Sequence, residues 1–197
     1  MMTLVYIHGF NSSSASVKGR LLQQAVQMRG QGVQMVAPDL PFEPVKAINL
    51  LQHVVEKALA ETPVMLVGSS LGGYYATYLA ERCGTKAVVV NPAVRPYELL
   101  YKYLGVQRNI YTDEEYALTA AHIDQLKALE VQPITGSERY LLMLQTGDEV
   151  LDFRQAIAKY RGCPQIMIEG GDHGFQNFSD YIERILAFGQ RPSSTQV

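Results

Sequence analysis

The chain of 197 residues has no tryptophan, only two cysteines and few charged side chains. The small numbers of cysteines and of charged side chains exclude certain classes of fold and of binding partner. Two cysteines are too few for a disulfide scaffold. We expect Cys83 and Cys163 to be free thiols, because another strand should separate the strands that they precede. With a net charge of -2 and no basic run, nucleic acid and anionic membrane surfaces are not expected as partners.

Long apolar runs and metal-ligand patterns are also missing. No segment approaches the roughly 20 apolar residues that span a bilayer. The four histidines have no cysteine or acidic partner at ligand spacing, so no metal site is expected. An apolar strand pattern begins at Thr3, where a signal peptide would otherwise stand, and this position favours a cytoplasmic protein. The length suits one domain with a sizeable core.

Six short apolar runs alternate with helical patterns along the chain. The expected strands cover 3–8, 33–37, 64–68, 86–90, 140–146 and 165–169. They lack strict alternation, as expected when helices cover both faces of a parallel sheet. The sequence therefore predicts a single α/β domain over 1–190, with a doubly wound, mostly parallel six-stranded sheet. Its site should lie at the carboxyl ends of the strands.

The segment 64–73, Val-Met-Leu-Val-Gly-Ser-Ser-Leu-Gly-Gly, is the most informative stretch. A buried strand pattern ends in Gly-x-Ser-x-Gly and a helical pattern follows at once. In this setting the motif forms a sharp turn that exposes its serine, so Ser70 is the candidate nucleophile. Ser69 lies one residue off the apex and is expected to be structural. The alternative is a glycine-rich turn without a catalytic role.

Two other strand ends supply what a serine nucleophile needs. The first strand pattern runs into His8 and a glycine, which resembles the oxyanion loop of α/β-hydrolases. The N–H groups of Phe10 and Leu71 are therefore the candidate oxyanion donors, and His8 is expected to be structural. After the last strand, a glycine-bounded loop carries His173. It is the candidate general base, because a neutral imidazole must take the proton of the serine.

The candidate acid follows the fifth strand pattern. Asp148 is the first carboxylate past that strand, and the chain order nucleophile, acid, base is the one found in α/β-hydrolases. Its role would be to orient the imidazole and stabilise its charged form. Glu149 and Asp152 share the loop and remain alternatives. Asp172, next to the histidine, is expected to shape its turn.

One segment breaks the alternation. The stretch 92–139 is far longer than a one-helix crossover needs, and we expect it to form a small helical cap over the nucleophile. The patterns predict a helix that begins near Thr112 and another over 120–129. Packing is the alternative role for its aromatic side chains. The polar tail 191–197 is expected to be flexible.

Substrate selection should reside in this cap and in the loop after the first strand, because the triad contacts only the acyl group that all esters share. Aromatic and aliphatic side chains there would form an apolar wall with a few hydroxyl groups. The candidate substrate-binding residues are Asn11, Ser12, Tyr97, Tyr101 and Leu104.

The chain resembles the α/β-hydrolases, and within them the small bacterial YqiA-type esterases. The resemblance rests on the segments 8–13, 68–73, 91–93, 147–152 and 170–173. It implies a minimal form of the fold, which lacks the antiparallel hairpin that opens larger members. It also implies cytoplasmic hydrolysis of carboxylic esters or thioesters without a cofactor, whereas the fold alone does not settle the natural substrate.

The function that we predict is that of a serine hydrolase acting on small-molecule esters or thioesters with short to medium acyl chains. An acyltransferase or a peptidase would carry the same triad, and the acceptor alone would differ. A third hypothesis is a non-catalytic interaction protein on a hydrolase scaffold. The sequence does not indicate an oligomeric state.

Overall fold

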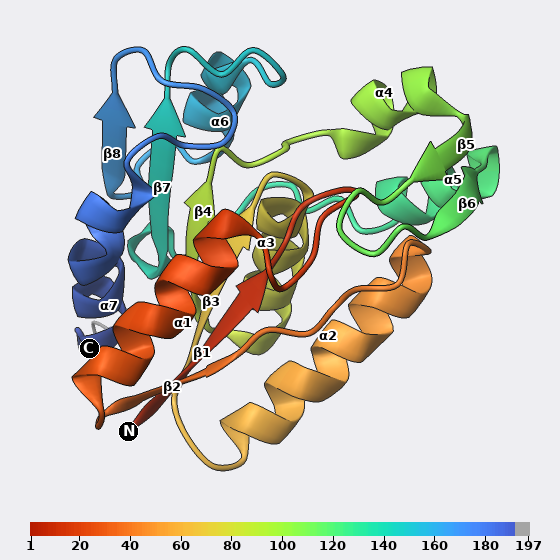
Figure 1. Ribbon diagram of the computed structural model, residues 1–197. Helices are drawn as coiled ribbons and strands as arrows, with labels where there is room; N and C mark the ends of the chain where they lie inside the picture. The colour runs from red at the N-terminus through yellow and green to blue at the C-terminus, as the bar shows by residue number, and fades with distance from the viewer. Residues whose placement is uncertain (192–197) are drawn as a thin grey trace.

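The computed structural model describes residues 1–191 and contains a parallel six-stranded sheet in the order β2-β1-β3-β4-β7-β8 (Figure 1). Every neighbouring pair in this sheet runs parallel. The predicted fold class is confirmed. The strands are β1 (Met2–Ile7), β2 (Val33–Val36), β3 (Val64–Ser69), β4 (Lys86–Val90), β7 (Tyr140–Gln145) and β8 (Gln165–Ile168).

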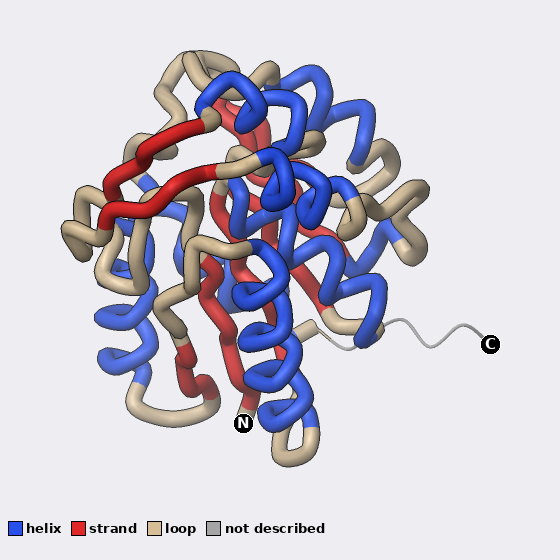
Figure 2. The backbone as a smooth tube through the Cα atoms, turned by 90° about the vertical axis from the view of Figure 1, so that its right-hand side faces the viewer, coloured by secondary structure: helices blue, strands red, loops and turns tan. Residues whose placement is uncertain are grey.

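Helices cover both faces of the sheet, as Figures 1 and 2 show. One face packs against α1 (Val17–Arg29), η3 (Phe178–Tyr181) and α7 (Ile182–Gln190). The other packs against α2 (Pro44–Leu59), α3 (Leu71–Cys83) and α6 (Phe153–Lys159). The central strands are therefore apolar on both faces, which explains their continuous apolar runs.

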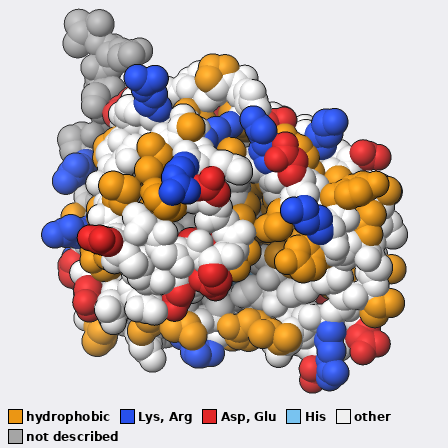
Figure 3. All heavy atoms as spheres, turned by 90° about the horizontal axis from the view of Figure 1, so that it is seen from above, with side chains coloured by type: hydrophobic (Ala, Val, Ile, Leu, Met, Phe, Trp, Pro, Cys, Tyr) orange, Lys and Arg blue, Asp and Glu red, His pale blue; other side chains and the backbone are white. Residues whose placement is uncertain are grey.

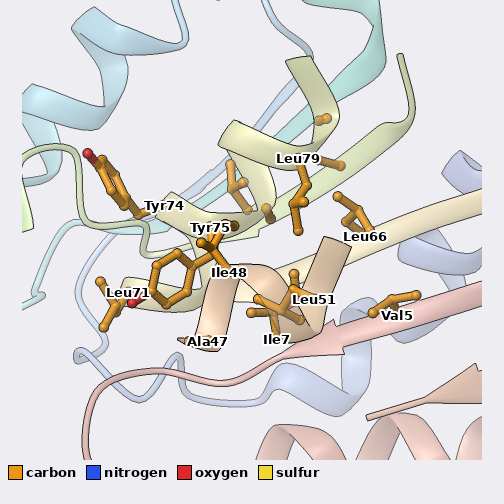
Figure 4. Packing of buried hydrophobic residues seen from close by; sticks show 14 of the residues in the cluster. Val5, Ile7, Ala47, Ile48, Leu51, Leu66, Leu71, Tyr74, Tyr75 and Leu79 are labelled. Atoms are coloured by element: carbon orange, nitrogen blue, oxygen red, sulfur yellow. The ribbon is translucent and has the colours of Figure 1, made fainter. Parts of the chain in front are cut away.

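Alternate residues of β1 show how the two layers are built. Leu4 and Tyr6 pack into the layer of α1, whereas Val5 and Ile7 pack into the layer of α2 and α3. Figure 4 shows the second layer, in which side chains of β1, β3, α2 and α3 pack together. All four β1 side chains are almost fully buried. Because side chains of a strand alternate between faces, β1 anchors both halves of the core.

The strand order places the candidate site. The chain begins at β1, crosses to β2 at the edge and then returns to β3 on the other side of β1. The connections that follow β1 and β3 therefore diverge to opposite faces of the sheet. In open α/β sheets a crevice forms at such a point, outside the carboxyl ends of the strands. The loops that carry Phe10 and Ser70 both begin there.

The insertion 92–139 is only partly helical. Its elements are α4 (Pro96–Leu100), η1 (Tyr101–Tyr103), β5 (Gly105–Arg108), β6 (Glu115–Leu118), α5 (Ala120–Lys127) and η2 (Ser137–Arg139). The expectation of a helix that begins near Thr112 is wrong, since a turn there leads into β6, which pairs antiparallel with β5. Alternating burial along β6 fits a strand that packs one face on the core.

The cysteines and the remaining expectations can be placed within the described residues. Cys83 and Cys163 are free, and β7 lies between the two strands that they precede, as predicted. Among residues 1–191, no helix combines the length and hydropathy that crossing a bilayer requires. The expected flexible tail, 191–197, lies outside the described residues except for Arg191.

Close packing between β1 and α3 gives a test of the fold. A Cβ on Gly72 would lie 2.0 Å from the carbonyl oxygen of Ile7. We expect Gly72→Ala to lower the free energy of unfolding by about 1–3 kcal/mol, because the backbone cannot move away. Urea denaturation measures this change in the free energy of unfolding. In the control Gly189→Ala the methyl group meets the mobile ends of Met2 and Met65, so the loss should be smaller. Equal losses would contradict this view of the packing.

Candidate active site

Ser70 forms the apex of the turn between β3 and α3. Its backbone has φ 55° and ψ −120°, which a side chain other than glycine rarely adopts. Backbone hydrogen bonds hold this conformation: the N–H of Ser70 donates to Val90, and its carbonyl oxygen accepts from Gly73 and Ala93. Ser69, one residue earlier, is buried in β3. The strained turn presents the Ser70 hydroxyl at the carboxyl edge of the sheet.

Three side chains from three loops meet in a row. The Nε2 atom of His173 lies 3.0 Å from the Ser70 hydroxyl oxygen. On the other side of the ring, Nδ1 lies 2.8 Å and 3.0 Å from the two carboxylate oxygens of Asp148. With the Nδ1 proton donated to the carboxylate, Nε2 can accept the proton of the serine. The arrangement is that of a nucleophile, a base and an orienting acid.

The environment of Asp148 keeps its carboxylate charged. Its side chain is almost fully buried, and burial raises the pKa of the carboxyl group. Hydrogen bonds from His173 and from the N–H groups of Leu151 and Val150 outweigh burial, so the pKa lies below its ordinary value. Asp148 therefore stays ionised at neutral pH and can stabilise a charged imidazolium.

The neighbouring carboxylates have other partners. Glu149 accepts a hydrogen bond from the backbone N–H of His173, at 3.0 Å. Asp152 caps the amino terminus of α6 through the N–H of Arg154. Asp172 accepts from the side chain of Gln176. None of the three bonds the imidazole ring within the described residues, so the geometry favours Asp148 over the alternatives.

Two N–H groups beside the nucleophile are free to receive an oxyanion. Neither Phe10 nor Leu71 donates its backbone N–H to an acceptor among residues 1–191. The two residues line one small hollow together with Gly9. A Cβ on Gly9 would lie 3.2 Å from the Cβ of Ser70, so the loop passes directly beside the nucleophile. This placement suits both groups as oxyanion donors.

Side chains of the insertion hold the oxyanion loop in place. The Tyr116 hydroxyl donates to Asn11 Oδ1 at 2.6 Å, and the Asn11 amide donates to Gln107. The Asn109 amide donates to the carbonyl oxygen of Ser12. Asn11 was expected to bind substrate, but both its amide atoms already have protein partners. The β5–β6 pair thus braces the loop that carries Phe10.

Two buried amides, to which the sequence assigned no role in the site, hold the loop of His173. Asn91, at the end of β4, donates to the carbonyl oxygens of Asp172 and His173 at 3.0 and 3.2 Å. Gln145, at the end of β7, accepts from the N–H groups of Asp172 and Gln176 and donates to the Gln176 carbonyl oxygen. In the sequence, each of these residues is a polar amide at the end of an apolar strand, and this pattern could have indicated their role in holding the loop.

A cavity of about 530 Å³ opens beside Ser70, between α1 and the loop that follows β8. Ser12, a candidate substrate-binding residue, lines this cavity. From the insertion, Tyr111 contributes to its wall. The volume falls in the range of small-molecule sites. The large space near the nucleophile therefore lies mainly beside α1, away from most of the insertion.

The other candidate substrate-binding residues do not line this cavity. Tyr97 packs against the layer of α2 and α3, and burial raises its pKa to about 12. Tyr101 and Leu104 are exposed on the insertion. Figure 3 looks onto this face of the molecule, where exposed hydrophobic side chains gather on the side of the insertion. The exposed large hydrophobic side chains of the insertion are Tyr101, Tyr103, Leu104, Val106, Ile110 and Tyr111.

His8, in the oxyanion loop, lies outside the triad. His8 donates through Nδ1 to the Gly9 carbonyl oxygen and accepts at Nε2 from the N–H of Leu40. Burial lowers its pKa, so the neutral ring serves as a structural link. Within residues 1–191, no three histidine, cysteine or acidic side chains gather as a metal site.

Comparisons with known proteins agree with the fold. The sequence family described as "Uncharacterised protein family (UPF0227)" matches residues 3–190. The UPF0227 protein YcfP of Salmonella paratyphi A is 30% identical over 189 residues, covering 94% of this chain and 97% of the relative. A UPF0227 protein of Serratia proteamaculans is 28% identical over 201 residues, with 96% and 99% covered.

Solved structures give the same result at lower identity. Est1E of Butyrivibrio proteoclasticus has a TM-score of 0.71 and 15% identity, covering 95% of this chain and 87% of its own. The mouse α/β hydrolase domain-containing protein 10 has a TM-score of 0.67 and 16% identity, with 94% and 89% covered. A monoacylglycerol lipase of Paleococcus ferrophilus reaches 0.66 and 15%, with 95% and 93% covered. The fold is that of the α/β-hydrolases, and the resemblance noted in the sequence is confirmed.

The amide of Gln145 gives a prediction about the loop. Gln145→Ala would leave the partly buried N–H groups of Asp172 and Gln176 without their acceptor, which costs about 1 kcal/mol each, the lower end of the range for unsatisfied groups. We expect a lower free energy of unfolding and faster hydrogen exchange at those two amides. The control is Gln155→Ala, an exposed substitution on α6. Unchanged exchange in the Gln145 variant would show that the loop is held otherwise.

Proposed function

Since the chain belongs to the UPF0227 family and has the α/β-hydrolase fold, we propose that it is a serine hydrolase of carboxylic esters or thioesters. One observation carries the proposal. The Ser70 hydroxyl, the His173 ring and the Asp148 carboxylate form a continuous hydrogen-bonded row beside two free N–H groups. Acyl transfer needs these parts in this arrangement.

The first half of the proposed reaction forms an acyl-enzyme. The Ser70 oxygen attacks the acyl carbon while Nε2 of His173 takes its proton. The N–H groups of Phe10 and Leu71 bind the oxygen that becomes negative. His173 then returns the proton to the leaving oxygen or sulfur as its bond to carbon breaks. Asp148 keeps the imidazole in the correct tautomer and stabilises its charge throughout.

In the second half, water replaces the leaving group. His173 takes a proton from water as the water oxygen attacks the acyl carbon, and then returns a proton to the Ser70 oxygen as its bond to the acyl carbon breaks. The products are a carboxylic acid and the free enzyme. The proposed reaction uses groups of the chain itself and requires no cofactor. An acyltransferase or a peptidase would differ in the acceptor or in the bond cleaved.

The two free thiols support the cytoplasm as the proposed location. Cys163 is buried, and burial raises the pKa of its thiol to about 11. Such a thiol is a poor nucleophile. That both cysteines are unpaired fits a reducing compartment, where disulfides rarely persist.

The assignment of the nucleophile predicts a contrast between adjacent serines. Ser70→Ala should lower kcat for p-nitrophenyl acetate by about 10⁴-fold or more, because the other triad groups act only through this oxygen. Ser69→Ala, within β3, should keep most of the activity. A fluorophosphonate probe followed by peptide mass spectrometry should place the adduct on Ser70. Absence of any adduct on folded protein would refute the proposed function.

The assignment of the acid predicts a second contrast. Asp148→Asn preserves the shape but favours the wrong imidazole tautomer, which costs on the order of 10⁴ in kcat in a protease triad. Asp152→Asn and Glu149→Gln, whose side chains do not reach the ring, should cost far less. Steady-state kinetics of the three variants measure this. A larger loss in the Asp152 variant than in the Asp148 variant would show that the acid is wrongly assigned.

A further inference from the structure

The spaces on the two sides of Ser70 differ greatly in size. Ser70 and His173 line the cavity of about 530 Å³, whereas the hollow of about 30 Å³ lies next to Phe10 and Leu71, the two candidate oxyanion donors. Resting on the proposed function, we infer that the substrate is a short-chain ester or thioester of a large, uncharged alcohol or thiol. The inequality of the two spaces carries this inference.

The direction of proton transfer assigns the large cavity. The general acid must reach the leaving atom within hydrogen-bond distance, so the leaving group lies against the His173 ring. The cavity begins at His173 and continues along residues 174–179 to α1. A leaving group that receives its proton from Nε2 therefore extends into this cavity.

The lining of the cavity indicates the kind of leaving group. Leu21, Phe175 and Phe178 supply apolar surface. Lys18 and Asp172 contribute opposite charges, and the Lys18 ammonium donates to the Gly174 carbonyl oxygen at 2.8 Å. The cavity thus favours neither sign of charge. An uncharged group with apolar surface and some hydrogen-bonding atoms matches this lining.

The opposite side of the nucleophile is almost closed. The hollow beside Leu71 is lined by Phe10, Phe42, Tyr75 and Tyr116. Phe42 stacks on Tyr116 with ring centres 4.2 Å apart, and Tyr75 is fully buried, so these walls are packed in place. A space of about 30 Å³ admits roughly two water-sized groups. On this inference, the oxyanion and one or two acyl carbons would occupy it.

Two series of substrates test the inference on the wild-type protein. The first contains acetates of alcohols from methanol to 2-naphthylethanol, and the second contains methyl esters from acetate to octanoate. We expect kcat/KM to rise at least about tenfold along the first series and to fall at least about tenfold along the second beyond propionate. The opposite trend in either series would overturn the inference.

Filling the large cavity provides a variant with a matched control. Leu21→Trp should lower kcat/KM for the naphthylethyl acetate about tenfold more than kcat/KM for methyl acetate, whose leaving group is too short to extend along the cavity. Met28→Trp changes an exposed residue on the same helix, outside the cavity, and should alter neither rate. Equal rates of Ser70 labelling by a small fluorophosphonate show that both variants are folded. Equal effects of Leu21→Trp on both acetates would overturn the assignment of the cavity.

Opening the hollow tests the acyl side. Phe42→Ala should raise the ratio of hexanoate to acetate hydrolysis about tenfold, since it removes one wall. An unchanged ratio, with normal labelling of Ser70, would overturn the short-chain assignment. If the wild type neither labels nor hydrolyses any ester of the two series, the proposed function itself fails. If Ser70 is labelled but the kcat/KM trends of the two ester series are reversed, only the inference about the substrate is overturned.

Discussion

The turn at Ser70 is the constraint on which the site depends. A backbone at φ 55° and ψ −120° is costly for serine, and it persists because its surroundings determine it from several sides. Gly72 lets α3 approach the carbonyl oxygen of Ile7 in β1, and Gly68 lets the turn fold back on the helix. The same close packing brings the oxyanion loop against the nucleophile. The strained backbone of Ser70, the close packing of α3 and the position of the free N–H groups thus all depend on the same turn.

The position of His173, the candidate base, depends on buried hydrogen bonds to its loop. The loop of His173 follows an edge strand, and apart from the buried Phe175 its residues are exposed or half-buried, so its backbone groups need partners. Asn91 and Gln145 supply them from the ends of two buried strands. Because both amides are buried, a displaced loop would leave several polar groups without partners. The position of the imidazole is therefore fixed by the sheet.

The insertion shows where the expected secondary structure was wrong. In place of a helix that begins near Thr112, the chain forms the β5–β6 pair, which contacts the oxyanion loop through Tyr116 and Asn109. Periodicity identified α5, whereas the short strands around 105–118 carry too few residues for a period to be read. Tyr97 and Leu104 do not line the cavity beside Ser70, and their role as substrate contacts stays a prediction, because composition does not reveal which face of an insertion meets the site.

The sequence by itself determined the sheet, the strand ends and the three residues proposed as the triad. Apolar runs mark buried strands, and glycine patterns mark tight turns in which larger side chains are disfavoured. Tertiary structure alone decided that Asp148 and not Asp152 meets the ring, that Asn91 and Gln145 hold its loop, and where space remains beside Ser70. Local patterns fix local conformation, but distances between loops far apart in the chain follow only from how the layers pack.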